Sequence, residues 1–407
     1  MGAVSRPDAA PLPERVLTTL QGLRRFPDVE DPTLRAWDAT DELLLREGLD
    51  EIRRRGLSGP DVAVLGERHG ALTLGLASAG VTGVRVLQDR LVHERALAAN
   101  AAALGLAHTW EQIAATPEAL EGARLLLWQL PRAVDAVARQ VALLSRVAPD
   151  ALLIAGGRVK HLSTGMNTPL SAGFGEVHPQ LAERKSRLLR VQRDAGRGLP
   201  APSSATATVH VAGHRLSLVG IGEAFGGAAL DPGTRLLLES LIAEGTAPEP
   251  GDVVVDLGCG NGTVAAWAGL AWPGTRIEAT DDSSDAVASA AATIGATLGA
   301  DRLVDAASLP QPGQLRVVRA DAGDHLAAGS ADLVLLNPPF HQGGTVHVGI
   351  GVKLIQAAAC LLRPGGRLVT VYNSHLQHRG RLGSIVGPTR QVARNRTFTV
   401  TVSTRRG

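Results

Sequence analysis

The feature that most constrains the fold of this chain is a series of short apolar runs that recurs in both halves of the sequence. In the first half, Val62–Gly66 and Ala123–Trp128 are apolar stretches of strand length. In the second half, Val253–Gly258 and Ala331–Leu336 follow in the same order. Helical stretches separate the runs, and strands that alternate with helices predict a parallel sheet covered on both faces. The sequence therefore predicts a tandem duplication of one α/β unit.

A segment rich in Gly, Pro and Ser at residues 196–205 separates the two copies, and such a cluster is typical of a linker. A chain of 407 residues is also long for one hydrophobic core. The expected domains are residues 1–198 and residues 206–407. In the second domain, Val209–Val219 alternates well enough to predict a hairpin, and Thr234–Ala243 is expected to form a helix.

Composition and short motifs argue against several classes of protein. Hydrophobic residues make up 44% and charged residues 20% of the chain, as in folded globular proteins. The sequence has no signal-peptide core and no apolar window of about 18 residues, so we expect a cytoplasmic protein without membrane contact. Cys259 and Cys360 cannot form a disulfide framework, and His375 and His378 lack further ligands at zinc spacing. We therefore expect no metal.

A Gly-rich turn follows the first strand of the second copy. Its pattern combines Asp256 with Gly258, Gly260 and Gly262, and Asn261 precedes the last glycine. Such a turn lets backbone amides and a carboxylate close around a ligand. A nicotinamide cofactor would use a similar turn, so the glycines alone leave a dehydrogenase open.

Acidic residues follow the next two strands of this copy. Asp281 and Asp282 end the second strand, 25 residues after the acid of the turn, where a carboxylate can accept both hydroxyls of a ribose. Asp321 and Ala322 follow the third strand, where an acid can accept an adenine amino group. These positions predict a nucleoside-containing cofactor.

The fourth strand of the second copy is followed by Asn337, Pro338, Pro339 and Phe340. A double proline cannot continue a central strand, because it has no N–H to give, so the chain must leave the sheet there. A carboxamide offers hydrogen-bond acceptors and an aromatic ring offers a stacking surface, in the crevice where open α/β sheets bind ligands. The motif suits a planar nitrogen nucleophile and disfavours a dehydrogenase.

Positive charge is concentrated in two runs, although the formal net charge is only +2. From Leu333 to the end there are ten Arg and Lys residues and no Asp or Glu, and a second run closes the first half. Either run alone can be a solvated face, but together with a base-compatible pocket they favour an anionic polymer. The candidate RNA-binding residues are Arg184, Lys185, Arg379, Arg381, Arg394 and Arg396.

Together, the turn, the acids and Asn337–Phe340 resemble the class I S-adenosylmethionine-dependent methyltransferases. Two further segments, Leu34–Asp41 and Ala224–Thr234, are similar to those of the bacterial ribosomal RNA guanine-N2 methyltransferases. The large-subunit type is the nearer match and the small-subunit type the next, over nearly the whole chain. The resemblance implies two Rossmann-like domains, each a mostly parallel seven-stranded sheet with helices on both faces, and a degenerate first domain.

The resemblance also implies contacts with the cofactor, S-adenosylmethionine. Asp256 would face its methionine part, Asp281 its ribose and Asp321 its adenine. A cap over the cofactor would come from Phe225, Asp231 and Thr234. The family usually has Phe-Ser-Arg before its Gly-Leu-Asp, and the arginine is missing here, because Phe225 is followed by two glycines and two alanines.

The same resemblance implies a substrate and a mechanism. The side-chain oxygen of Asn337 and the carbonyl of Pro338 would accept the N–H groups of guanine N2, and Phe340 would stack on an unpaired base. The expected partner is ribosomal RNA or a ribosomal subunit precursor, and a monomer is expected.

The first copy has lost the polar residues of the second. It has Leu65–Gly70 in place of the Gly-rich turn, with charged side chains where glycines are expected. We match Trp128–Pro131 with Asn337–Phe340, and Ile154–Val159 with Arg363–Val369. The first domain is therefore expected to bind RNA or to be structural.

Two alternatives remain open from the sequence. An Asn-Pro-Pro-aromatic motif also suits methylation of adenine N6 or of a protein glutamine. An alternative of another class is an RNA-binding ribosome assembly factor without catalysis, although the intact acids and glycines of the second copy argue against it.

Overall fold

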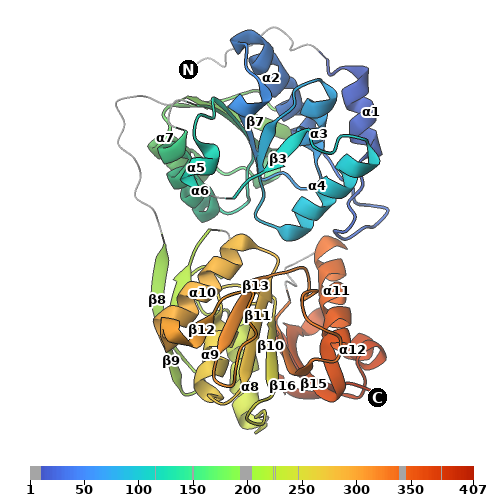
Figure 1. Cartoon of the computed structure of the whole chain (residues 1–407), viewed down its shortest axis with the longest axis vertical. Coiled ribbons are helices and arrows are strands. Elements are labelled where there is room, and N and C mark those ends of the chain that lie inside the picture. Colours follow the sequence, from blue (N-terminus) through green and yellow to red (C-terminus); the bar gives the residue numbers. More distant parts are fainter. Residues whose placement is uncertain are drawn as a thin grey trace. The chain divides into compact units, whose positions relative to one another are not determined.

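The computed structural model describes residues 11–114, 116–148, 151–192, 204–222, 224, 226–245, 247–338, 345–376 and 378–407. The chain divides into two compact units, Met1–Ser203 and Ser204–Gly407. Figure 1 shows the first in blue to green and the second in yellow-green to red. Each unit has its own large sheet, so each is described by itself. In the described part of the chain, no helix is long and apolar enough to cross a membrane.

The first unit is a seven-stranded sheet in the order β3-β2-β1-β4-β5-β7-β6. The first five strands are parallel, whereas β7 runs antiparallel to β5 and to β6. Its described strands and helices are β1 (Val62–Leu65), β2 (Val84–Leu87), β3 (Trp110–Gln112), β4 (Leu125–Gln129), β5 (Leu152–Arg158), β6 (Val177–Pro179), β7 (Ser186–Gln192), α1 (Glu14–Gly22), α2 (Ala39–Arg55), α3 (Ala71–Ser78), α4 (Leu91–Ala103), α5 (Pro117–Leu120), α6 (Val134–Val147) and α7 (Asn167–Gly173).

The second unit begins with the hairpin of β8 and β9 and continues into an eight-stranded sheet in the order β12-β13-β11-β10-β14-β15-β17-β16. Among its described strands only β17 runs against the others, because it is antiparallel to both of its neighbours, β15 and β16. Its described elements are β8 (Ala205–Val211), β9 (His214–Gly220), β10 (Val253–Leu257), β11 (Arg276–Asp281), β12 (Leu303–Val304), β13 (Leu315–Arg319), β14 (Ala331–Leu336), β15 (Leu362–Asn373), β16 (Thr389–Arg394), β17 (Phe398–Thr404), α8 (Pro232–Ala243), α9 (Thr263–Ala271), α10 (Ser284–Leu298), α11 (Thr345–Leu361) and α12 (Arg379–Ile385).

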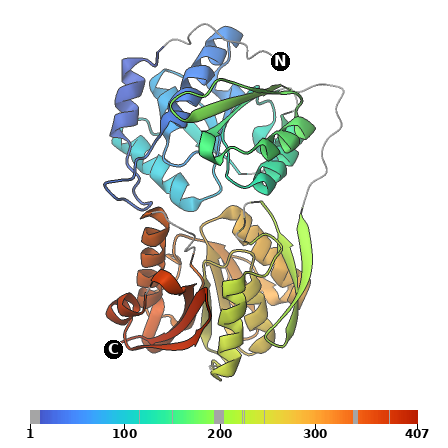
Figure 2. The same ribbon diagram turned by 180° about the vertical axis from the view of Figure 1, so that it is seen from behind.

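Both sheets bury both faces, because successive side chains of a strand point to opposite sides. In β10, Val254 packs into the core shared with α8, α9 and α10, whereas Val255 packs into the core shared with α11 and α12. In β1, Val64 and Leu65 divide in the same way between two cores. Figure 2 shows the yellow-green helix α8 on its face of the second sheet.

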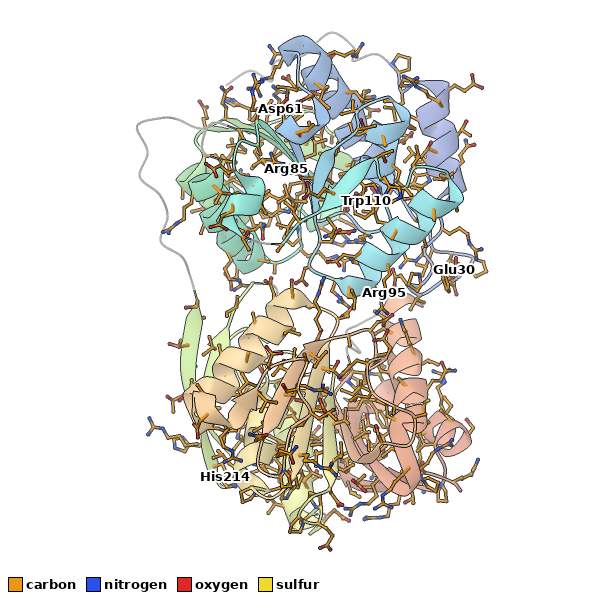
Figure 3. The ribbon with its side chains drawn as sticks, in the orientation of Figure 1. Glu30, Asp61, Arg85, Arg95, Trp110 and His214 are labelled. Atoms are coloured by element: carbon orange, nitrogen blue, oxygen red, sulfur yellow. The ribbon has the colours of Figure 1, made fainter. Side chains whose placement is uncertain are left out.

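Arg85 lies in β2, and its side chain binds three backbone carbonyls near the amino ends of the neighbouring strands. Its guanidinium donates to the carbonyls of Pro60, Ala119 and Glu121, at 2.7 to 3.1 Å. Pro60 lies in the short 3-10 helix Gly59–Asp61 before β1, and Ala119 and Glu121 lie in and directly after α5, before β4. Arg85 and Asp61 are labelled in Figure 3. The half-buried guanidinium of Arg85 therefore satisfies three backbone carbonyls at this end of the sheet.

The structure confirms the strands predicted at the four recurring runs, the hairpin and the helix α8. The number of strands is wrong for the second sheet, which has eight instead of seven. The additional strand, β12, has only two residues and pairs with β13 at the edge. A strand of that length shows no alternation that a sequence could reveal.

The strand registers also correct two matches between the copies. Leu65 of β1 pairs with Trp128, and Leu257 of β10 pairs with Leu336. Trp128 therefore corresponds to Leu336, and the counterpart of Asn337 is Gln129. The match of Ile154–Val159 with Arg363–Val369 is wrong too, because the glycines end β5 but lie near the start of β15.

Candidate active site

The predicted site residues of the second unit come together because four parallel strands end at one edge of its sheet. β10 lies between β11 and β14, and Leu257 pairs with both Thr280 and Leu336, the residues near their carboxyl ends. β13 continues the sheet on the β11 side. The chain order reverses at β10, and ligands bind at such switch points in open α/β sheets.

The glycines of the turn after β10 have two different tasks. Gly258, Gly260 and Gly262 all have left-handed backbones, with φ of 81°, 52° and 77°. A Cβ at Gly262 would lie 2.6 Å from the Cα of Ala290, so this glycine lets α9 pack closely on α10. A Cβ at Gly258 would meet no atom within 4 Å, so the space in front of the turn is open to a ligand.

Asp256 is buried beneath the turn, with 3% of its surface exposed. Its Oδ2 accepts the N–H of Ala265 at 3.0 Å, in the first turn of α9. Burial, with Asp281 nearby, raises the pKa of Asp256 to about 7. The carboxyl group therefore holds the first turn of α9, which follows the Gly-rich turn, and changes its charge near neutral pH.

This raised pKa predicts a pH dependence of stability. A carboxyl whose pKa is higher in the folded chain stabilises the fold at low pH, and that contribution is lost as the pH rises through about 7. We expect the melting temperature of the wild-type chain, without cofactor, to fall from pH 5 to pH 8 relative to that of Asp256→Asn. Thermal unfolding of both proteins at several pH values over this range measures the difference between their melting temperatures. A difference that stays constant with pH would contradict the prediction.

Asp281 connects the turn with the start of α10. Its Oδ2 accepts the N–H of Gly260 at 3.0 Å, and its Oδ1 accepts the N–H of Ser283 at 3.1 Å. A carboxylate oxygen has two lone pairs, so the group can still accept hydroxyl groups of a ribose. Asp282 follows it and is partly exposed.

Asp321 lies beyond the end of β13 and pairs with a residue that the sequence did not reveal. The Nζ of Lys353, on α11, lies 2.6 Å from both carboxylate oxygens of Asp321. The next residue, Ala322, has a left-handed backbone with φ of 53°, which is unusual for a residue with a side chain. Lys353 lies 32 residues away in the sequence, so no local spacing could predict the pair.

Asn337 is held in one orientation by the N-terminus of α8. Its Nδ2 donates to Oδ2 of Asp231 and to Oγ1 of Thr234, both at 2.9 Å. A carboxylate only accepts hydrogen bonds, so the atom that faces Asp231 must be the amide nitrogen. With both amide hydrogens directed at α8, the Oδ1 atom of Asn337 is left as the acceptor for a substrate. Pro338 is buried beside it, whereas Pro339, Phe340 and Phe225 lie outside the described residues.

Asn261 has a positioning role that the glycine pattern did not show. Its Nδ2 donates to the carbonyls of Gly227 and Ala229 at 2.9 and 3.0 Å, and its Oδ1 accepts from Thr263. These bonds tie the segment before α8 to the Gly-rich turn. The segment that carries Asp231 is therefore fixed over the edge where the strands end.

The first unit has the same frame with different side chains. The registers place Arg68 at the position of Gly260, and Gln88 at the position of Asp281. Glu67 is buried, with a pKa raised by burial to about 7, and accepts the N–H groups of Leu72 and Thr73 at the start of α3. The first unit therefore carries the longer side chain of Arg68 where the second unit has Gly260, and Gln88 where the second unit has Asp281.

The predicted RNA-binding residues differ in how far their charge is available. Arg184 and Lys185 lie exposed in the turn before β7, but Arg184 forms an ion pair with Glu42. On the second unit, Arg379 and Arg381 are exposed on α12, and Arg394 and Arg396 are exposed on and after the edge strand β16. The second group lies on and beside α12 and β16, which contact each other through the bond from Arg379 to the carbonyl of Thr389.

Among the described residues, one group has the composition of a metal site, and it lies in the first unit. Asp28, His69 and His93 have potential ligand atoms within 4.8 Å of one another. The Nη2 atom of Arg25 lies 2.5 Å from Oδ2 of Asp28, and His69 bonds the same oxygen at 2.9 Å. A guanidinium at that oxygen opposes a second cation, so these residues fit a hydrogen-bond network better than a metal.

The second unit is a doubly wound sheet with a Gly-rich turn after its first strand, acids after the next two strands and Asn-Pro after the fourth. This combination defines a class I methyltransferase. The model of the RLMG N-terminal domain matches residues 16–195, and that of the methyltransferase small domain matches residues 216–402. The chain is 30% identical to ribosomal RNA large subunit methyltransferase G of Shewanella amazonensis, covering 93% of this chain and 94% of the relative. The same protein of Streptomyces coelicolor is 33% identical, with 96% and 98% covered. The chain belongs to the ribosomal RNA large subunit methyltransferase G family.

A solved structure shares the fold of nearly the whole chain. It is the Thermus thermophilus 16S rRNA N2 G1207 methyltransferase in complex with AdoMet and guanosine. The TM-score is 0.68 at 21% identity, with 93% of this chain and 97% of that chain covered. The two-unit architecture is therefore shared between proteins of low sequence identity.

Proposed function

We propose that this chain transfers the methyl group of S-adenosylmethionine to the exocyclic N2 of a guanine in large-subunit ribosomal RNA. The observation that carries the proposal is the orientation of Asn337, whose Nδ2 is held by Asp231 and Thr234 so that Oδ1 remains for the substrate. The exocyclic amine of guanine is a poor nucleophile, because its lone pair is delocalised into the ring. An acceptor at Asn337 stabilises the charge that develops on this nitrogen.

The donor and acceptor groups at the carboxyl ends of the strands of the second sheet match those of the cofactor. The open space in front of Gly258 admits a ligand close to the backbone, Asp281 accepts the ribose hydroxyls, and Asp321 accepts the adenine amino group. When bound, S-adenosylmethionine supplies an electrophilic methyl group on a sulfonium. Asp231 and Thr234 position Asn337, and Asn261 holds the segment above the turn.

Catalysis then rests on positioning and hydrogen bonding. Holding the amine in line with the methyl group at van der Waals distance can lower the barrier by roughly 7 to 11 kcal/mol. Asn337 Oδ1 and the carbonyl of Pro338 direct the two N–H groups, so the lone pair faces the methyl group. As the N–C bond forms and the methyl–sulfur bond breaks, the amine would become acidic and its proton would pass to water, so no side chain with a strongly basic character is required.

We also propose a division of labour between the two domains. Residues 206–407 catalyse, and the exposed Arg379, Arg381, Arg394 and Arg396 contact phosphates, which set affinity rather than base choice. Residues 1–198 do not bind the cofactor, because Glu67 and Arg68 stand in place of Cys259 and Gly260, and we assign them to RNA binding through exposed cations such as Lys185. We propose that the protein acts as a monomer in the cytoplasm, where its ribosomal RNA substrate is found. We propose no metal and no membrane contact for it.

The decisive experiment uses ribosomal RNA from a strain that lacks the enzyme. We expect labelled S-adenosylmethionine to transfer its methyl group to large-subunit RNA, and nucleoside analysis to recover N2-methylguanosine. Small-subunit RNA and a protein extract serve as parallel substrates. Recovery of N6-methyladenosine or of methylated glutamine would overturn the proposal, and RNA binding without any transfer would favour the assembly factor.

A further inference from the structure

An exposed aromatic loop of the first unit has no role in the site described above. The loop joins α1 and α2 over residues 23–37, projects from the first unit (Figures 1 and 2), and is called the Phe26 loop here. The side chain of Phe26 is 59% exposed. Of the large hydrophobic residues that the structure describes as exposed, it is the single aromatic one, in a chain with only 3% aromatic residues. Single exposed apolar side chains are common on protein surfaces, so the case for a binding partner rests on the other groups of this loop.

The base of the Phe26 loop is fixed to the core by buried polar groups. Asn100, on α4, accepts the N–H of Arg24 at 3.0 Å and donates to its carbonyl at 2.8 Å. Arg25 donates to the carbonyl of Val29 at 2.7 Å as well as to Asp28. His69 bonds the carbonyl of Ala36 at 3.0 Å. The loop is therefore preorganised, and a ligand would not have to order it.

A pocket of about 560 Å³ lies within this loop and combines three kinds of groups. Arg24 and Arg35 supply cationic donors, Glu30 and Asp31 supply carboxylate acceptors, and Trp37 supplies an aromatic surface. Glu30, labelled in Figure 3, pairs with Arg24 at 2.9 Å, and both are exposed. Among the described residues, no carboxylate pairs with the exposed guanidinium of Arg35. The volume lies in the range of small-molecule sites.

We propose that the Phe26 loop binds an unpaired stretch of RNA, with one nucleotide in the pocket and the next base stacked on Phe26. Aromatic rings beside arginines are the usual contacts of single-stranded nucleic acid. The carboxylates would repel a free phosphate, but they accept the ring N–H and amino groups of a base, so the pocket fits a nucleotide better. The carboxylates also distinguish this loop from a purely electrostatic surface.

The inference deepens the proposed function, since it names the RNA-binding element of the first domain. It replaces the turn of Arg184 and Lys185 as the principal contact of that domain, because Arg184 is paired with Glu42. It does not depend on methyl transfer, so RNA binding can be measured without cofactor and kept separate from catalysis.

The test compares Phe26→Ala with Leu181→Ala, which removes another exposed apolar side chain of the same unit, 70% exposed. The full chain is titrated, without cofactor, into a fluorescent unstructured RNA 12-mer and into the matching duplex. We expect Phe26→Ala to weaken binding of the single strand about tenfold, in line with the loss of one stacked base. Duplex binding and the Leu181→Ala variant should stay near wild type.

A second pair of variants tests the pocket. Arg35→Ala is expected to weaken the single-strand complex and to reduce its salt dependence, whereas Arg53→Ala, which removes a 65% exposed arginine on α2, should change neither. Equal affinities of Phe26→Ala and wild type would overturn the inference. An equal loss of affinity for single-stranded and duplex RNA would also overturn it. The same holds if Phe26→Ala changed the oligomeric state of the protein and not its affinity for RNA. If the chain transferred no methyl group but Phe26→Ala still weakened binding of single-stranded RNA, only the proposed function would be overturned.

Discussion

Replacing Asn337 by alanine is expected to lower kcat by roughly 10²–10³-fold, the usual effect of losing one preorganised transition-state partner. Affinity for S-adenosylmethionine should stay within a few-fold of wild type, because the substitution leaves unchanged the Gly-rich turn and the acids that we propose contact the cofactor. Single-turnover transfer from labelled cofactor to ribosomal RNA measures the first quantity, and calorimetric titration with the cofactor measures the second.

The first unit offers a matched control for this variant. Gln129 occupies the position of Asn337 and bonds Asp41, a buried carboxyl on α2 whose pKa is raised to about 8 by burial. Gln129→Ala removes a carboxamide from the same place in the fold, but it should leave methyl transfer intact. An active Asn337→Ala chain, or a Gln129→Ala chain that loses transfer while remaining folded, would show that the catalytic edge is misassigned.

The sequence was sufficient for the arrangement of the site, because its motif residues follow strands directly. Asp281 ends the strand Arg276–Asp281, Asn337 follows the strand Ala331–Leu336, and the carboxyl ends of parallel strands meet at one edge. Their proximity therefore follows from topology alone. The glycines of the turn were predictable for the same reason, since only glycine adopts their left-handed backbone readily.

The remaining features depend on contacts between distant segments. Asn337 bonds Asp231 across 106 residues, and Lys353 pairs with Asp321 across 32. Neither spacing is periodic, so neither pair leaves a pattern in the sequence. The sequence matched Trp128 with Asn337, whereas the structure matches Gln129 with it, and this error has a similar origin. A shift of one residue keeps an apolar run apolar, and only the pairing with β1 decides the register.

The comparison of the two units also shows how a site can be lost while its frame persists. Asn261 bonds the carbonyl of Ala229, two residues before the N-cap Asp231 of α8. His69 bonds the carbonyl of Ala36, two residues before the N-cap Asp38 of α2. In both units a side chain of the turn therefore holds the segment before the helix, whereas Asp281 of the second unit is replaced by Gln88 in the first.

Asp281→Ala is expected to weaken S-adenosylmethionine binding by about 100-fold or more. The carboxylate accepts both ribose hydroxyls in the proposed complex, and each hydrogen bond to a charged group contributes about 1.5–3 kcal/mol. The substitution also removes the acceptor of the Gly260 and Ser283 N–H groups, so the turn loses its connection to α10. Both effects act in the same direction. Calorimetric titration, or competition against S-adenosylhomocysteine, measures the loss.

Two further variants separate ligand contact from turn support. Asp281→Asn keeps one acceptor oxygen for the backbone but loses the charge and the second acceptor, so we expect an intermediate affinity with a melting temperature near wild type. Gln88→Ala alters the corresponding position of the first unit and should leave cofactor affinity unchanged. If Asp281→Ala bound the cofactor as tightly as wild type, the ribose could not lie at the end of β11. If Gln88→Ala weakened binding instead, the first unit would hold the cofactor, and the inference that Glu67 and Arg68 fill that place would fail.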